Sequence, residues 1–278
     1  ASCLVGSEMC IRDRFKCLTV YYYIMIKHNL IHILAPIVTT NSSAIIKTPL
    51  NRVSKVFYNK DCYLNELHIL SMLQHPNIIK VIKHYTDEYK KGVIEFKYYT
   101  EGDLLSFINT HTRNKTKNVT NNHRLEIFNT ITNTLSYCHQ KNIIHGDIKP
   151  ENFLLENRNP ILIDFGLSIH NKHFYNSLEK NIVIRHGRQG SAGYIAPEVK
   201  DNYIGPSSDV YSLGIVLYQL FINEYPYFNN DILELDCTTT HEHIPYKVCN
   251  LLHEMLHVDY KQRPTLEEII MDYDIQNF

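Results

Sequence analysis

The segment from residue 142 to residue 168, NIIHGDIKPENFLLENRNPILIDFGLS, concentrates side chains that can act in phosphoryl transfer. Asp147, Lys149 and Asn152 lie close together, and a further carboxylate, Asp164, follows twelve residues after Asn152. A triphosphate and its metal ions carry dense charge, so catalysis depends mainly on positioning and electrostatic neutralisation. One carboxylate can orient the attacking hydroxyl, while the other, with an amide oxygen, can hold Mg²⁺. The spacing therefore predicts a phosphoryl-transfer site.

Two short apolar runs, residues 153–155 and 161–163, flank the polar turn ENRNP within this segment. Such runs around a turn favour a β-hairpin. Because Asn152 precedes the first run and Asp164 follows the second, pairing of the runs would bring the amide and the second carboxylate into one cleft.

The surrounding elements are expected to divide into a β-rich first part and a helical second part. Apolar and β-branched runs between polar turns predict strands in residues 31–40, 44–47, 52–57, 78–87 and 91–99. Apolar residues at a helical period predict helices in residues 62–74, 123–140, 209–221, 244–256 and 265–273. The run at 209–221 is apolar on nearly all sides, so it is expected to be a buried central helix. The pattern predicts an α+β fold with a small antiparallel β lobe carrying one helix and a larger, mainly helical lobe.

Composition narrows the class of protein. A chain of 278 residues suits one domain of two lobes. A net charge of -1 and a pI of about 7.0 give no sign of a nucleic-acid or membrane partner. Seven cysteines, an odd number without regular spacing, predict reduced thiols in an intracellular protein.

The N-terminal residues are treated apart from the fold. The run LVGSEMCIRD at residues 4–13 resembles a translated sequencing adapter, so residues 1–13 are expected not to be native. Residues 14–30 form an extension of uncertain role whose apolar run is too short to span a membrane. The functional domain is expected at residues 31–278, with the small lobe at about 31–96 and the large lobe at about 97–278.

Five motifs in fixed order carry a resemblance to the eukaryotic protein kinase superfamily, serine/threonine type, over residues 31–278. HGDIKPEN resembles the catalytic loop, DFG the metal motif, and GSAGYIAPE the end of the activation segment. DVYSLG and the late Arg263 resemble anchors of the large lobe. The resemblance implies a two-lobed protein-kinase-like fold and a buried ion pair between Glu198 and Arg263.

The resemblance also implies a set of site residues. Those for catalysis are Asp147, Lys149, Asn152 and Ser191, with Asn152 and Asp164 as ligands of Mg²⁺. Those for ATP are Lys55, Glu66, Glu95, Lys97, Asp103, Leu154 and Asp164. Lys55 would contact the phosphates and pair with Glu66, the backbone of Glu95 and Lys97 would bond adenine, and Asp103 would reach the ribose. Lys60 is the rival of Lys55, but it lies among turn residues.

Two departures from the family pattern are visible. The stretch that matches the glycine-rich phosphate loop, residues 38–46, contains no glycine, and Ser42, Ser43 and Ala44 are only partial substitutes. This change predicts weakened ATP binding. Gly146 replaces the arginine that commonly precedes the catalytic aspartate, which predicts an enzyme that is not switched by a phosphate on its activation segment.

The resulting prediction is a serine/threonine protein kinase that uses ATP and Mg²⁺. Lys149 and Ser191 favour serine and threonine over tyrosine as the acceptor. Two alternatives stay open: a pseudokinase scaffold with weak nucleotide binding, and a small-molecule kinase, a class that shares HGD but would not be expected to carry the later motifs. The expected partners are a protein substrate and ATP, without nucleic acid or membrane, for a monomer located in the cytoplasm or nucleus.

Overall fold

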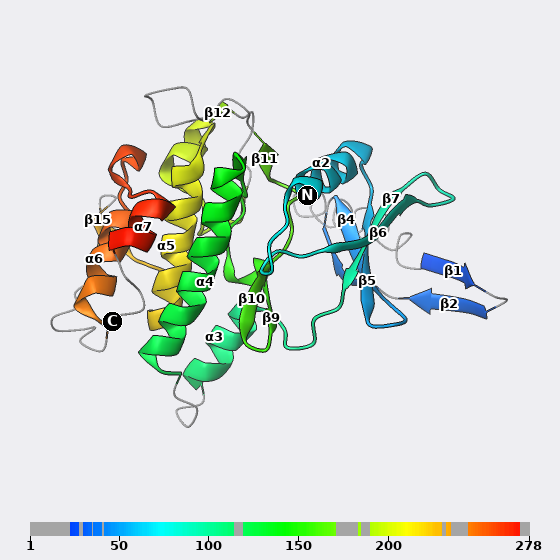
Figure 1. The fold of residues 1–278 in the computed structure, drawn as a ribbon, viewed down its shortest axis with the longest axis horizontal. Coiled ribbons are helices and arrows are strands. Elements are labelled where there is room, and N and C mark those ends of the chain that lie inside the picture. The colour runs from blue at the N-terminus through cyan, green and yellow to red at the C-terminus, as the bar shows by residue number, and fades with distance from the viewer. Residues whose placement is uncertain are drawn as a thin grey trace, which may run out of the picture. The chain divides into compact units, whose positions relative to one another are not determined.

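The computed structural model describes residues 23–27, 30–34, 36–40, 42–113, 119–170, 183–184, 190–229, 232–234 and 244–272 (Figure 1). These residues belong to two compact units. The first is drawn from residues 1–64 and 80–98, and the second from residues 65–79 and 99–278. Each unit has its own framework and is described by itself.

The first unit is built on a five-stranded antiparallel sheet with the order β3-β4-β5-β7-β6. Its strands are β3 (Pro36–Thr39), β4 (Ser43–Thr48), β5 (Arg52–Phe57), β6 (Val81–Thr86) and β7 (Gly92–Lys97). Alternate residues of the central strands face one side, where Ile46, Val56 and Val93 form a buried apolar cluster. A separate hairpin joins β1 (Tyr23–Lys27) to β2 (Leu30–Leu34).

Helix α2 (Lys60–Met72) begins in the first unit and continues into the second. Its start is fixed by Asn59, whose side-chain oxygen accepts hydrogen bonds from the backbone N–H groups of Asp61 (2.6 Å) and Cys62 (3.3 Å). Such a cap satisfies donors that a helix leaves unpaired at its first turn.

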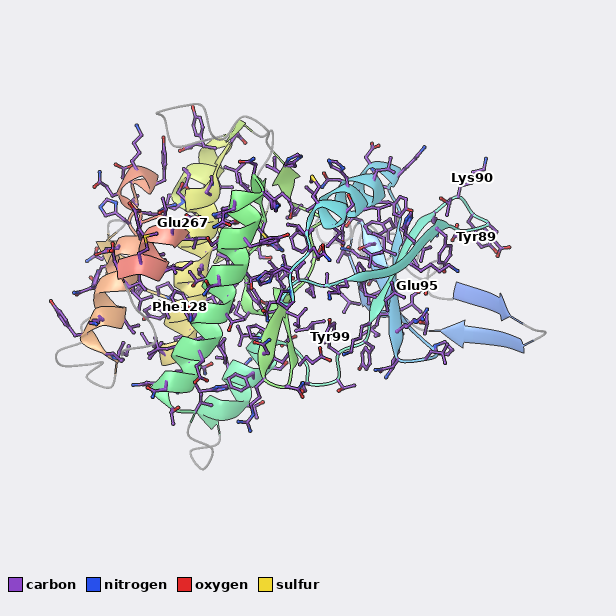
Figure 2. All side chains as sticks on the ribbon, in the orientation of Figure 1. Tyr89, Lys90, Glu95, Tyr99, Phe128 and Glu267 are labelled. Carbon is purple, nitrogen blue, oxygen red and sulfur yellow. The ribbon has the colours of Figure 1, made fainter. Side chains whose placement is uncertain are left out.

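The second unit is mainly helical. Its helices are α3 (Leu104–Arg113), α4 (Asn121–Gln140), α5 (Pro206–Ile222), α6 (Tyr246–Met255) and α7 (Leu266–Asp272). Helices α4 and α5 run side by side in its centre (Figure 1). Phe128 projects from α4 into the apolar core, and Ser136 on α4 donates a hydrogen bond to Glu267 on α7 at 3.1 Å (Figure 2).

Short elements complete the second unit. The strands are β8 (Ile143–Ile144), β9 (Phe153–Glu156), β10 (Asn159–Leu162), β11 (Ile169–His170), β12 (Val183–Ile184), β13 (Tyr203–Ile204), β14 (Phe228–Asn229) and β15 (Ile232–Leu233). The 3₁₀ turns are η1 (Pro150–Asn152), η3 (Pro197–Asp201) and η4 (Tyr260–Gln262). Strand β8 pairs with β11, and β9 pairs with β10. These pairs hold the loop segments that carry the polar motifs.

The α+β class and the division into a β-rich and a helical part are confirmed. The strand expected at 52–57 has those bounds, and the buried helix expected at 209–221 is α5, which starts three residues earlier because Pro206 suits the first turn of a helix. The domain boundaries stay a prediction, and residues 1–13 lie outside the described residues. Among the described helices, none combines the length and apolar character needed to cross a bilayer.

The expectation of reduced thiols holds at two of the described cysteines. Cys62 and Cys138 are free thiols, and burial raises the pKa of Cys138. Cys249 is disulfide-bonded, so the expectation is wrong there. Cysteine spacing along the sequence did not reveal this bond, because a disulfide depends on proximity in the fold.

The expected ion pair between Glu198 and Arg263 is confirmed. The two guanidinium nitrogens of Arg263 donate to the two carboxylate oxygens of Glu198, each at 2.8 Å, and both residues are buried. The remaining Arg263 donors reach the carbonyls of Ser207, His257 and Val258, and Ser208 donates its hydroxyl to Glu198. Every charged group in this buried pair therefore has partners, which is the condition for tolerating it inside a protein.

Replacement of Arg263 by alanine should strand the Glu198 carboxylate in an apolar setting. We expect Arg263→Ala to lower the free energy of unfolding by about 3–5 kcal/mol, because the buried charge loses its counterion. Urea unfolding followed by circular dichroism measures the change. The matched control is Lys200→Ala, which removes an exposed cation from η3 and should change stability by less than about 0.5 kcal/mol. A loss below about 1 kcal/mol in Arg263→Ala would contradict the structural role of this pair.

Candidate active site

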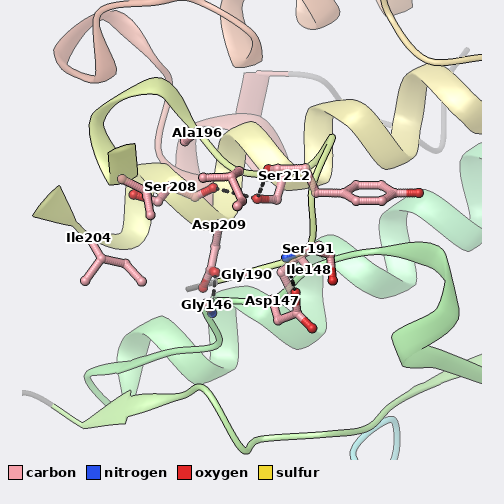
Figure 3. A pocket seen from close by; sticks show the side chains of 13 residues that line it. Gly146, Asp147, Ile148, Gly190, Ser191, Ala196, Ile204, Ser208, Asp209 and Ser212 are labelled. Carbon is pink, nitrogen blue, oxygen red and sulfur yellow. Dashed lines mark hydrogen bonds between the residues drawn. The ribbon is translucent and has the colours of Figure 1, made fainter. Parts of the chain in front are cut away.

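The catalytic-loop segment is attached to the central helix through Asp209. One carboxylate oxygen of Asp209 accepts the backbone N–H of His145 at 2.8 Å, and the other accepts the N–H of Gly146 at 2.9 Å (Figure 3). His139, in the last turn of α4, places its Nε2 atom 2.9 Å from the first of these oxygens. Because an ionised carboxylate only accepts hydrogen bonds, Nε2 of His139 carries the proton. Three donors from α4 and the loop thus converge on one buried side chain.

The electrostatic setting keeps Asp209 ionised. Burial alone would raise the pKa of the Asp209 carboxyl, because a low-dielectric interior disfavours charge. Burial is outweighed by the hydrogen bond from His139, by the electrostatic influence of His139 and of the nearby His145 ring, and by the hydrogen bond from the Gly146 N–H. The pKa of Asp209 therefore lies below its ordinary value. The loop is therefore anchored by a carboxylate that stays charged at neutral pH.

His145 links this loop to the second acidic motif. Its Nε2 atom lies 3.1 Å from the carbonyl of Ile163, and its Nδ1 atom accepts the N–H of Asp147 at 3.3 Å. In this arrangement Nε2 donates to the carbonyl and Nδ1 accepts from the loop backbone. The ring also meets the side chain of Phe165 edge to face, with centroids 5.0 Å apart, and Ser168 donates to the His145 carbonyl at 3.0 Å. The histidine thereby fixes the segment around Asp164 relative to Asp147.

The hairpin predicted around ENRNP is present. Phe153 pairs with Leu162 in the β9–β10 ladder, and the N–H of Ile163 donates to the carbonyl of Asn152 at 2.9 Å. This closing bond brings the two ends of the hairpin together. Asp164, the residue after Ile163, therefore follows directly beside Asn152. Asp164 has a positive φ of 62° and accepts the N–H of Gly166 at 3.3 Å.

Glu101 holds the tip of the hairpin. Its two carboxylate oxygens accept the N–H groups of Asn157 at 2.7 Å and Arg158 at 2.9 Å, two residues with positive φ. The bonds from Arg158 and Asn157 lower the pKa of Glu101. A side chain more than fifty residues away in sequence thus stabilises the turn that positions the second acidic motif.

Asp147 is surrounded by donors from three expected site residues. One oxygen accepts the backbone N–H of Ser191 at 2.9 Å. The other lies 3.0 Å from Nζ of Lys149 and 3.1 Å from the amide nitrogen of Asn152. Nζ of Lys149 also donates to the hydroxyl of Ser191 at 2.5 Å. The structure therefore brings Asp147, Lys149, Asn152 and Ser191 together, and Ser191 contacts the aspartate through its N–H group rather than through its hydroxyl.

The orientation of Asn152 bears on metal binding. Its amide nitrogen also donates to the carbonyl of Asp147 at 2.7 Å, so both bonds to Asp147 use the nitrogen. The amide oxygen consequently points away from Asp147, as a ligand of a hard cation requires. An amide oxygen and a carboxylate are hard oxygen ligands, so Asn152 and Asp164 are the residues that could hold Mg²⁺, which usually takes few protein ligands and completes its shell with water and phosphate oxygens. Among the described residues no cluster of three or more His, Cys, Asp or Glu side chains suits a metal.

The residues expected to bind the nucleotide differ in their settings. Lys55 is buried in β5 whereas its rival Lys60 is exposed at the start of α2, and Glu66 is buried in α2. Burial of a lysine is costly without a specific role, so the contrast favours Lys55 over Lys60.

The remaining nucleotide candidates lie on β7, just before α3, and on β9. Glu95 forms an ion pair with Arg52 at 3.2 Å, and Lys97 is the exposed last residue of β7. Asp103 accepts the N–H of Ser106 at 2.7 Å and so caps α3. Leu154 lies on β9 and is partly buried. Backbone groups of Glu95 and Lys97 take part in the sheet, and the Asp103 carboxylate has a structural role of its own.

The glycine-free turn between β3 and β4 is organised by Thr40. Its hydroxyl oxygen accepts the N–H groups of Ser42 at 3.3 Å and Ser43 at 3.1 Å. Ser43 and Ala44 are buried, so of the three small residues considered as substitutes for glycine only Ser42 is exposed. The turn therefore directs two of its backbone donors to Thr40 and not outwards.

A small pocket lies behind Asp147, between the catalytic loop, residues 190–199, β13 and the start of α5 (Figure 3). Its volume is about 10 Å³, which is close to the space of one water molecule. The pocket is too small for a nucleotide or a peptide.

Several functional contacts were not predicted. The role of His139 was missed, although a histidine in the last helical turn before the HGD motif was a visible signal. Asp209 was expected only as a general anchor, and its bonds to the loop backbone could not be read from the sequence. Glu101 gave no signal, because its partners are backbone groups.

The arrangement is of the protein-kinase type, with an aspartate held by donors, a neighbouring lysine and amide, and a second carboxylate that follows a hairpin. A family model for the protein kinase domain matches residues 37–273, and the chain belongs to this family.

Three curated relatives illustrate the similarity. The chain is 33% identical over 214 residues to a probable serine/threonine-protein kinase MARK-A of Dictyostelium discoideum, which covers 74% of this chain and 19% of the relative. It is 30% identical to CBL-interacting protein kinase 24 of Oryza sativa subsp. japonica, covering 74% and 45%. It is 32% identical to sucrose non-fermenting protein kinase 1 of Fusarium virguliforme, covering 74% and 29%. The chain thus spans less than half the length of these relatives.

Replacement of Asp209 by asparagine should weaken the fold in a pH-dependent way. Asparagine has one acceptor oxygen, so buried N–H groups lose a partner, and we expect a loss of about 1–3 kcal/mol at pH 7. Because the pKa of Asp209 is lowered in the folded state, its contribution is complete above the ordinary aspartate value of about 3.9. That contribution disappears as the pH falls further through the lowered folded value.

Urea unfolding of the parent and Asp209→Asn between pH 7 and pH 3 measures this difference. The gap in unfolding free energy should be constant at neutral pH and should narrow below about pH 4. Asp201→Asn is the matched control, because Asp201 is an exposed aspartate of the same unit, and it should show no gap. A gap that is absent at pH 7, or unchanged at low pH, would refute the proposed anchoring by an ionised Asp209.

Proposed function

We propose that the chain transfers the γ-phosphoryl group of ATP to serine or threonine hydroxyls of protein substrates. The observation that carries the proposal is the set of donors around Asp147, contributed by Lys149, Asn152 and Ser191. Such a carboxylate is fixed in position and can accept a hydrogen bond from an incoming hydroxyl. The names of the curated relatives agree with this assignment: one is a probable serine/threonine-protein kinase, and another is a sucrose non-fermenting protein kinase.

In this proposal Asp147 orients the acceptor hydroxyl and takes up its proton as transfer proceeds. Lys149, which reaches both Asp147 and the Ser191 hydroxyl, places a positive charge where negative charge develops on the transferred group. Asn152 and Asp164 would hold Mg²⁺, which neutralises the phosphate oxygens. Ser191 ties the segment that follows the active site to both catalytic side chains.

The nucleotide is proposed to bind through the set of residues that the resemblance implies. Lys55 would contact the α- and β-phosphates and pair with Glu66, and its burial within β5 supports this choice over Lys60. The backbone of Glu95 and Lys97 would bond adenine. Asp103 would reach the ribose, and Leu154 would line the base. The Thr40 hydroxyl accepts the backbone N–H groups of Ser42 and Ser43, so these groups are not directed to a phosphate. We therefore expect a higher KM for ATP than a glycine-rich turn would give.

Gly146 leads to a proposal about regulation. An arginine before the catalytic aspartate would remain an uncompensated cation until a phosphate reached it. Here the backbone at this position is fixed by Asp209, and its positive φ of 80° suits glycine. The loop is therefore proposed to reach its working geometry without phosphorylation of the activation segment.

The alternatives have less support. A pseudokinase scaffold is not favoured, since Lys55, Glu66, Asp147, Asn152 and Asp164 are all present and the relatives are named as kinases. A small-molecule kinase does not account for the match to the protein kinase domain over residues 37–273. The near-neutral charge supports a protein substrate over nucleic acid. A monomeric state, an intracellular location and the absence of a membrane partner stay predictions.

The function is tested by kinetics on purified protein with Mg-ATP and a generic serine/threonine peptide. We expect Asp147→Asn to lower kcat by about 10²–10⁴-fold, because the amide cannot take up the hydroxyl proton. The thermal shift produced by Mg-ATP should remain close to that of the parent. Asp201→Asn, an exposed aspartate of the same unit, is the control and should keep full turnover.

Two results would overturn the proposal. Unchanged turnover in Asp147→Asn would remove this aspartate from the reaction. A parent protein that shows neither a Mg-ATP thermal shift nor phosphate transfer to any peptide would remove the kinase assignment itself.

A further inference from the structure

Gly190 lies where the segment that carries Ser191 meets the catalytic loop. Its φ is +125°, a backbone conformation that residues with a side chain rarely adopt. A Cβ atom built at this position would lie 3.1 Å from Cγ1 of Ile195 and 3.5 Å from the carbonyl oxygen of Gly146. Both the conformation and the space at residue 190 therefore call for glycine.

The contact has a direct consequence for Asp147. Ser191, the next residue after Gly190, donates its backbone N–H to Asp147 at 2.9 Å, and Gly146 is the residue immediately before that aspartate. Gly190 and Ser191 on one segment therefore lie beside Gly146 and Asp147 on the other (Figure 3). A change in the backbone at Gly190 would move the Ser191 N–H, which belongs to the next residue.

The surroundings leave little room to absorb a displacement. Gly190 and Gly146 both line the pocket behind Asp147, whose volume is only about 10 Å³. The Gly146 backbone cannot move away easily, because its N–H is held by the buried Asp209 at 2.9 Å. A side chain at residue 190 would therefore shift its own segment and not the catalytic loop.

We propose that Gly190 is a positioning residue for phosphoryl transfer: its backbone conformation with positive φ, which a side chain would strain, places the Ser191 N–H on the Asp147 carboxylate. The inference rests on the proposed function of Asp147. It adds a requirement for the backbone at residue 190 to the requirements for the reacting side chains, because Gly190 itself supplies no group to the reaction. The Ser191 N–H orients one oxygen of Asp147, and loss of that bond would leave the carboxylate misdirected toward the acceptor hydroxyl.

Gly102 offers a matched comparison within the same unit. Its φ is +82°, so a side chain there is also strained, but a Cβ atom would meet only Cβ of Ser106 at 3.9 Å. Substitution at Gly102 thus introduces backbone strain in open space, whereas substitution at Gly190 introduces strain and a tight contact with Ile195 directly before Ser191, whose N–H reaches Asp147. The two positions separate a general loss of stability from a specific loss of positioning.

The experiment compares alanine and valine at each position in the full chain, with kcat and KM measured well below the unfolding temperature. We expect kcat to fall about tenfold in Gly190→Ala and about a hundredfold in Gly190→Val, since small misplacements of reacting groups are costly. The KM for ATP should stay within about twofold, because the contact concerns the acceptor side of the site. Gly102→Ala and Gly102→Val should keep kcat within about threefold.

Hydrogen exchange of the Ser191 amide gives a readout that does not depend on activity. The amide should be protected in the parent and in Gly102→Ala and should exchange faster in Gly190→Ala. If valine at residue 190 prevents folding, the alanine variant and its exchange rate still decide the question. Full kcat with a protected Ser191 amide in Gly190→Ala would overturn the proposal, as would an equal loss of kcat in Gly102→Ala.

Failure of this inference is distinguishable from failure of the proposed function. If Asp147→Asn is inactive while Gly190→Ala behaves as the parent, only the positioning role is wrong. If Asp147→Asn turns over normally, the function assigned to the site is wrong, and the exchange rate of the Ser191 amide then reports only on the contact itself.

Discussion

The arrangement of the active site depends on one buried carboxylate. Asp209 accepts the N–H groups of His145 and Gly146, and His139 holds it from the neighbouring helix. Burying a charge is costly unless it is fully hydrogen-bonded, and these donors meet that condition. Asp209 belongs to α5, a helix that is buried on nearly all sides. The backbone of the catalytic loop is therefore attached to the core of the second unit. Removal of this anchor would release the backbone directly before Asp147 from the helix.

From this anchor the geometry of the second unit follows in short steps. The fixed backbone at His145 orients a ring that bonds the Asp147 N–H on one side and the Ile163 carbonyl on the other. The hairpin then determines the position of Asp164, which follows its second strand. Asn152, at the other end of the hairpin, directs its amide nitrogen to Asp147. The substitution of glycine for arginine at residue 146 is compatible with this scheme, because the loop is held by Asp209 without help from a phosphate.

Much of this arrangement could be predicted from local sequence. The β9–β10 hairpin was predictable because two apolar runs flank a polar turn, and α5 because its apolar residues leave no solvent-facing side. The catalytic group of residues was recognised from five ordered motifs, and the contacts among Asp147, Lys149 and Ser191 agree with that choice.

Other features depend on contacts between distant residues and were out of reach. His139 and Asp209 are seventy residues apart, and nothing in either local pattern indicates their bond. At the β3–β4 turn the small residues Ser42 and Ser43 were expected to substitute in part for glycine, but the Thr40 hydroxyl takes up their N–H groups. The need for glycine at residue 190 follows from a backbone angle and a close approach, which a single sequence does not display.

The most direct test of the account concerns activity in the absence of phosphate on the protein. The chain is produced in bacteria, treated with phosphatase, shown by mass spectrometry to be unphosphorylated, and assayed at once for initial transfer of phosphate from ATP to a serine/threonine peptide. If Asp209 and the loop contacts are sufficient, the treated protein will turn over at the same initial rate as untreated protein. A treated protein that is inert, and that regains activity only after phosphate is restored on its activation segment, would contradict the account.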